Sequence, residues 1–96
     1  MRVDVTVVLM GLDGKPINDG SKDVTLRTVA TQALMASFQG EDVDGEEKFK
    51  RYQLAVRINA EDSLTISPEQ AAKLKLLIGK GFTPAVVGPC FELLNR

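Results

Sequence analysis

The sequence predicts a small α+β domain, with a helical core of three to four short helices and an N-terminal β-strand or hairpin packed on it. Alternating apolar residues near the N-terminus indicate the strand, and apolar residues three and four apart between residues 26 and 60 indicate helices. Two capping signals after residue 66 indicate a further pair of helices. At 96 residues, the chain (1–96) is expected to form a single domain that can bury a core without disulfides.

The N-terminal stretch, residues 2–10, has the period of a half-buried strand. Its alternate apolar positions are Val3, Val5, Val7 and Leu9. This period of two predicts that one face of the strand is buried. Turn signals follow at Asp13-Gly14 and at residues 18–21, and they indicate a hairpin or loop returning through residues 22–26. An isolated hairpin is marginal in water, so we expect it to pack on the helices.

Two helices are expected in the middle of the chain. In the first, residues 26–38, Thr25 can cap the N-terminus, and Gln39-Gly40 ends the run. The second, residues 46–60, follows an acidic stretch in which Asp44 can act as the cap. Its apolar stripe is wide, as expected for the middle helix of a small bundle. The stripe consists of Phe49, Tyr52, Leu54, Ala55, Val56 and Ile58.

A linker, residues 60–66, precedes the C-terminal third. It contains a short β-like piece at Leu64–Ile66, which either adds to the N-terminal strand or covers the core. The clearest helix start in the chain follows it. Ser67 can cap the helix, Pro68 suits the first helical position, and Gln70 can complete a capping box.

This helix is expected to end at Gly79 and Gly81, after which Thr83-Pro84 repeats the cap-and-proline signal. Because the link is short, the two helices should pack as a helical hairpin. Gly88-Pro89 predicts a break in the last helix, because a proline inside a helix removes a backbone donor and clashes one turn back. In that case Thr83–Val87 forms a single turn, and a new helix begins at the proline.

Helical spacing also predicts the core. Its expected members are Leu34, Phe49, Val56, Leu74, Leu77 and Phe91. Cys90 is expected to be a small buried residue, since free cysteine is commonly buried. On the surface, Glu46–Lys50 and Glu47–Arg51 are spaced four apart in the favourable order, worth roughly a few tenths of a kcal/mol each.

No catalytic residue, cofactor or metal is expected, and we predict that the chain is not an enzyme. It contains no histidine, the commonest catalytic base and metal ligand. The acidic run at 41–47 does not fit a calcium loop, because aligning Gly45 puts Gly40 and Arg51 at the two ends. Gly79-Lys80-Gly81 lacks the hydroxyl residue that follows the lysine of a phosphate loop, and a helix end explains it better.

The charge pattern and the lack of long apolar runs bear on location and partners. The net charge of −1 gives no general attraction to nucleic acid or to a membrane. No apolar run approaches the roughly 18–20 residues of a membrane span, and the N-terminus makes a poor signal peptide. With one cysteine, a cytoplasmic location is the expectation. Basic residues between Lys48 and Arg57 leave a small nucleic-acid-associated regulator as an alternative function, although acids balance them.

The second face of the N-terminal strand is unusual. Val8 and Met10 are apolar at positions where a half-exposed strand is normally polar. An unpaired strand edge is also a template for adding another strand. We therefore hypothesise a candidate partner surface that binds another protein or a second copy of this chain. Its residues are Val8, Met10, Leu12 and Ile17. The alternative is that the chain's own helices bury both faces of the strand.

Four segments that together span nearly the whole chain carry a resemblance to a known group of proteins. They read LDGKPINDG, TLRTVATQAL, KRYQLAVRI and LTISPEQAAKLKLLIGKGFTPAVVGPCFELLN, and they consist mainly of turn, cap and core residues. Together they resemble small proteins encoded in tailed-phage and prophage genomes. The resemblance carries no defined activity and no functional residue. It implies a phage-encoded accessory protein in a bacterial cytoplasm, one that binds another phage or host protein as an assembly helper or as a modulator. A non-catalytic protein-binding module is therefore the leading expectation.

Overall fold

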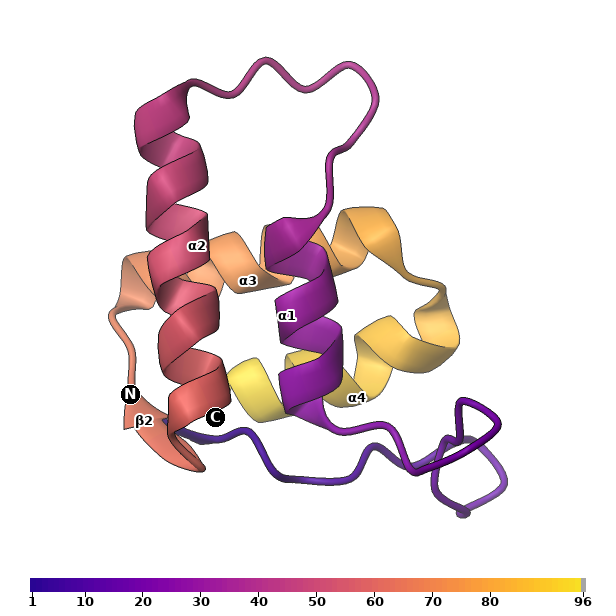
Figure 1. Cartoon of the computed structure of the whole chain (residues 1–96). Helices are drawn as coiled ribbons and strands as arrows, with labels where there is room; N and C mark the ends of the chain where they lie inside the picture. The colour runs from indigo at the N-terminus through magenta and orange to yellow at the C-terminus, as the bar shows by residue number, and fades with distance from the viewer. Residues whose placement is uncertain (96) are drawn as a thin grey trace.

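The computed structural model describes residues 1–95, and it shows the expected α+β fold (Figure 1). In chain order the elements are β1 (Arg2–Asp4), α1 (Leu26–Met35), α2 (Gly45–Ala60), β2 (Ser63–Thr65), α3 (Pro68–Gly81) and α4 (Pro84–Leu94). Helices α1 and α2 lie side by side, and α3 crosses behind them and packs on α1 (Figure 1). Helix α4 packs on α3, so these two form the predicted helical hairpin.

The two-stranded sheet joins the N-terminus of the chain to the segment that precedes α3. β1 pairs antiparallel with β2, placing Val3 opposite Leu64. The β-like piece before α3 therefore adds to the N-terminal strand, one of the two alternatives. Beyond β2, the backbone N–H of Ile66 donates to the carbonyl of Met1 at 2.8 Å. Because both strands bury their central side chain, the sheet forms one wall of the core.

The N-terminal strand is shorter than the predicted 2–10. The Asp4 carboxylate accepts hydrogen bonds from the N–H of Thr6 at 2.9 Å and from its hydroxyl at 2.6 Å. Such local bonds offer the backbone an alternative to a ladder, and they turn the chain out of β1. The alternation nevertheless persists in burial. Val3, Val5 and Leu9 are buried, and Val7 is partly buried.

Residues 7–25 form an extended arm rather than a regular hairpin (Figure 1). Isolated antiparallel bridges join Val8 to Thr25, Met10 to Pro16 and Asn18 to Asp23. The turns contain Gly14 and Gly20, whose φ angles of 77° and 104° favour glycine. The predicted return through residues 22–26 is therefore present, but only as single bridges.

The core lies between the helices and the sheet. Leu34, Leu74 and Leu77 are buried as predicted, and so is Cys90. Leu77, Ile78 and Cys90 are completely shielded from solvent. Three of the four capping predictions are also confirmed, since Thr25 and Asp44 cap α1 and α2, and Ser67 forms a capping box with Gln70. Thr83 stands at the N-cap position of α4, but its side chain makes no capping hydrogen bond. Helix α1 ends at Met35, three residues before the predicted Phe38, which still packs against the core.

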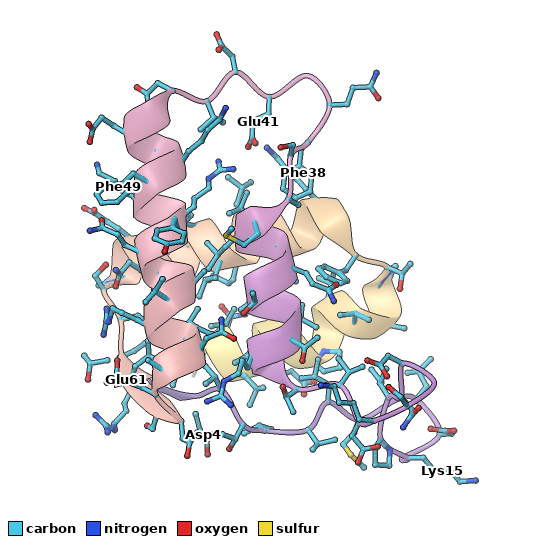
Figure 2. All side chains as sticks on the ribbon, in the orientation of Figure 1. Asp4, Lys15, Phe38, Glu41, Phe49 and Glu61 are labelled. Atoms are coloured by element: carbon cyan, nitrogen blue, oxygen red, sulfur yellow. The ribbon has the colours of Figure 1, made fainter. Side chains whose placement is uncertain are left out.

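Three core assignments were wrong or only partly right. Phe49 and Val56 are 53% and 47% exposed, and Phe91 is only partly buried. The buried residues of α2 are Arg51, Leu54, Ala55 and Ile58, which follow one another at spacings of three, one and three. The wide apolar stripe of α2 is thus two stripes on opposite sides of the helix, and only one faces α1 and α3. Figure 2 shows the Phe49 side chain directed away from the other helices.

The predicted break at Pro89 was also wrong, because α4 continues through it. Two features make the proline tolerable. Gly88 has no Cβ to meet the proline ring, which removes much of the clash that usually expels the preceding residue from helical conformation. The carbonyl that loses its donor belongs to Ala85, and this residue is exposed, so water can hydrogen-bond to it. The helix therefore keeps one apolar face across its full length.

Candidate functional site

The predicted partner residues are divided between a groove and the core. Val8, Met10 and Leu12 line a groove between the arm and α4. Val8 is partly buried, Met10 is 47% exposed, and Leu12 is completely exposed. Ile17 instead packs against the buried core. Helices of this chain therefore do not cover the whole second face of the N-terminal segment.

Helix α4 supplies the other wall of this groove. Its lining residues recur on one face at helical spacing: Pro84, Ala85, Gly88, Pro89, Glu92 and Leu93. We call the surface made by these six residues and Val7–Leu12 the arm–α4 groove. Its side chains are small or apolar except for Glu92, the one charged residue among them. The predicted break at Pro89 hid the α4 wall, although the helical spacing of Ala85, Gly88 and Glu92 is visible in the sequence.

The arm presents an open backbone edge to this groove. On the inner side of the arm, the backbone groups of alternate residues are hydrogen-bonded within the chain. The carbonyl of Val7 accepts from the N–H of Leu26 at 3.1 Å. The N–H groups of Leu9 and Gly11 donate to the carbonyls of Val24 at 2.9 Å and of Lys15 at 2.8 Å. Successive residues of an extended chain turn these groups to opposite sides. Within residues 1–95, the N–H and C=O groups of Val8 and Met10 make no hydrogen bond. These groups therefore remain available on the outer edge.

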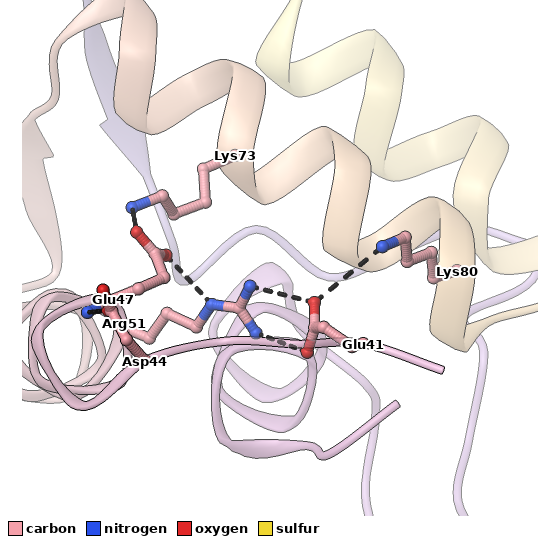
Figure 3. A network of polar contacts seen from close by, with 6 residues as sticks. All are labelled: Glu41, Asp44, Glu47, Arg51, Lys73 and Lys80. Atoms are coloured by element: carbon pink, nitrogen blue, oxygen red, sulfur yellow. Dashed lines mark hydrogen bonds and ion pairs between the residues drawn. The ribbon is translucent and has the colours of Figure 1, made fainter. Parts of the chain in front are cut away.

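A second candidate is a charged cluster centred on Arg51 (Figure 3). The Arg51 guanidinium makes two bonds of 3.0 Å to Glu41 and one of 3.1 Å to Glu47. Lys73 donates to Glu47 at 2.8 Å, and Lys80 lies 3.8 Å from Glu41. Arg51 is only 9% exposed, so its pairing matters, because an unpaired buried charge is costly.

The cluster joins the loop after α1 to α2 and α3, and the pKa values fit that structural role. Hydrogen bonding from Arg51 lowers the pKa of Glu41, and hydrogen bonding from Lys73 lowers the pKa of Glu47. Both carboxylates are therefore held charged and engaged with cations, which suits neither proton transfer nor metal binding. Among the residues that the structure describes, no group of three or more potential metal ligands comes together. The sequence indicated only the Glu47–Arg51 pair, since Glu41 and Lys73 come from separate elements.

Cys90 offers no alternative chemistry. Its thiol is buried in the core, and burial raises its pKa to about 11. The reactive form of cysteine is the thiolate, so a thiol with a raised pKa is inert at neutral pH. This is consistent with a packing role.

A second apolar area lies on α2, where Phe49, Tyr52 and Val56 are each about half exposed. Met35 at the end of α1 is 57% exposed, and it lines a pocket together with Tyr52. The basic and acidic side chains around this pocket are Arg51, Lys48, Glu41 and Asp42. These residues form a stripe at helical spacing, but the area has no open backbone edge, because the backbone groups of a helix are bonded internally.

Part of the basic charge on the described surface is neutralised by acids of the same chain. Arg51 and Lys73 are paired with the cluster carboxylates. Arg57 donates to the carbonyl of Thr65 at 2.8 Å and lies 3.8 Å from Glu61. Nucleic-acid binding relies on cations free to replace counterions at phosphates. On the helix proposed for that alternative, Arg51 and Arg57 are engaged with acids, whereas Lys48 and Lys50 are exposed and make no ion pair within the described residues.

Comparisons with known proteins identify no relative. No protein-family model matches the chain, and neither the curated proteins nor the solved structures contain a match. Among residues 1–95, no helix combines the length and apolar character needed to cross a bilayer.

Proposed function

We propose that the chain is a non-catalytic protein-binding module whose binding surface is the arm–α4 groove. The observation that carries this proposal is the exposed apolar wall of α4 facing the exposed Met10 and Leu12. Apolar side chains that gather in a groove rimmed by polar residues are typical of protein interaction sites. A catalytic role has no support from side-chain chemistry, since the carboxylates of the charged cluster are fully engaged.

A protein fits the groove better than a nucleic acid does. The groove is apolar, and its charged residue, Glu92, is negative, which would repel phosphates. Elsewhere on the described surface, five of the eleven basic side chains are paired with acids of the same chain. A protein segment with apolar side chains would instead gain from burial in the groove.

The resemblance to small tailed-phage and prophage proteins supports a more specific proposal. The chain would be a phage-encoded accessory protein that works in a bacterial cytoplasm. It would bind another phage protein or a host protein, as an assembly helper or as a modulator. Such roles require an exposed surface and no active site, which agrees with an apolar groove at the surface of the chain.

The test is affinity capture from bacterial lysate with the unmodified chain and two matched variants. Ala85→Arg places a long cation in the groove from an exposed position on α4, whereas Ala72→Arg makes the same change at an exposed position on α3. We expect a protein that the unmodified chain and Ala72→Arg capture equally and that Ala85→Arg loses. A capture pattern unaffected by Ala85→Arg would place the binding surface elsewhere, and no capture by any form would contradict the function.

A further inference from the structure

The groove runs along the backbone edge of the arm. All six consecutive residues from Val7 to Leu12 line it, including Leu9, whose side chain is buried. A groove lying against one face of an extended chain would meet only alternate side chains, because successive side chains point to opposite faces. The continuous lining therefore places the open N–H and C=O groups of Val8 and Met10 beside the groove.

The geometry points to an extended segment of another protein that adds to this edge as a β-strand; this inference deepens the proposed function and rests on it. Val8 and Met10 offer two donors and two acceptors at strand spacing, a pattern that main-chain groups of an added strand can satisfy. A helix cannot satisfy them, because its own backbone groups are bonded internally. The backbone edge therefore selects for an extended occupant.

The opposite wall defines the side chains that the occupant carries. Ala85 and Gly88 are small, so the α4 wall leaves room for an apolar side chain of the added segment. Glu92 is exposed in the same groove, and a lysine or arginine of the segment would complement it. The occupant is thus an extended, mainly apolar segment with one basic residue.

Charge also argues against a second copy of this chain as the occupant. Residues 7–12 of a second copy, the segment that would pair with the edge across a two-fold axis, read VVLMGL. That segment is apolar, but it contains no cation to place beside Glu92. A different protein that brings a basic residue therefore complements the groove better.

The test begins with displayed random peptides selected against the unmodified chain, with depletion on Ala85→Arg. The best peptide is then synthesised as the probe. We expect an extended sequence with a lysine or arginine, which slows amide hydrogen exchange at Val8 and Met10 on binding. Its affinity for Ala72→Arg should equal that for the unmodified chain. Glu92→Lys should weaken binding, and exchanging the peptide's cation for glutamate should restore it.

N-methylation of the peptide backbone gives the sharpest control. In an added strand, alternate residues direct their N–H groups to the arm, and the others direct them away. Methylating the peptide nitrogens whose N–H groups face the arm should weaken binding by about tenfold or more, because their hydrogen bonds to the arm are lost. Methylating the other nitrogens should leave the affinity nearly unchanged. Equal effects of both sets, without protection of Val8 and Met10, would overturn strand addition while leaving protein binding at the groove intact.

Other outcomes separate the inference from the function on which it rests. Peptides that protect the Phe49 and Tyr52 region instead would overturn the groove as the site, but not protein binding. Protection of Val8 and Met10 without peptide, together with a doubled solution mass, would show that a second copy is the occupant and overturn the inference. If every selected peptide also binds Ala85→Arg, or if no peptide is selected, strand addition is overturned. The capture experiment would then decide the function alone.

Discussion

Truncating Leu77 and Phe49 to alanine tests how α2 and α3 contribute to the core. The Leu77 side chain is completely buried, whereas Phe49 is 53% exposed. Leu77→Ala removes apolar contacts and leaves a cavity, which costs about 2–5 kcal/mol. In a domain of this size that corresponds to a fall in Tm on the order of 10–30 °C. Phe49→Ala leaves no closed cavity, and alanine favours the helix, so its net cost is about 1 kcal/mol or less.

Urea unfolding followed by circular dichroism measures both values. The slope of the free energy against urea should stay constant, so that the midpoint alone reports stability. Helical spacing in the sequence predicts that Phe49 and Leu77 both lie in the core, and therefore predicts similar losses of stability for the two variants. A Phe49→Ala loss equal to that of Leu77→Ala would refute the two-stripe description of α2. A Leu77→Ala loss within about half a kcal/mol of zero would refute the core position of Leu77 on α3.

Three further outcomes follow from the charged cluster, from the glycines near the end of α3 and from Cys90. Because the folded pKa values of Glu41 and Glu47 lie below the ordinary 4.5, their stabilisation is complete above that pH and is lost as pH falls through the folded values. A Tm series between pH 7 and pH 3 should therefore decline below about 4.5, and less so in Glu41→Gln. Gly79→Ala should stabilise α3 by about 0.5–1 kcal/mol in urea unfolding, since the added Cβ meets only an ordinary contact. Gly81→Ala should give less, because its Cβ would lie 3.3 Å from the Phe38 ring. Cys90 should resist a thiol reagent at pH 8 until denaturant is added; rapid labelling of the native chain would contradict its burial.

The sequence predicted local features well, because caps and turns depend on neighbouring residues. Ser67 with Gln70 and Asp44 at the start of α2 are examples. The α+β class and the burial of Leu77 also followed from residue spacing. What depends on distant parts of the chain did not follow, such as the bonds from Arg51 to Glu41 and from Lys73 to Glu47.

Two errors share a physical origin in tertiary context. The periodicity of α2 shows two apolar stripes, but only the packing partners decide that Phe49 lies outside. At Pro89 the expectation that a proline breaks a helix failed. Gly88 reduces the steric clash with the proline ring, and the exposed Ala85 carbonyl can bond to water in place of the missing N–H. For the candidate site, Val8, Met10 and Leu12 were identified from composition. The α4 wall was hidden by the predicted break, and Ile17 was assigned to a surface although it packs inward.

The arm–α4 groove as the binding surface is the central claim, and a nuclear magnetic resonance titration tests it most directly. The chain, uniformly labelled with ¹⁵N, is titrated with the protein identified by capture, and amide shifts are followed residue by residue. Shifts concentrated in residues 7–12 and 84–93, and absent from the same titration of Ala85→Arg, are the predicted result. Shifts concentrated around Phe49, Tyr52 and Val56 on α2, with the groove unchanged, would contradict the account.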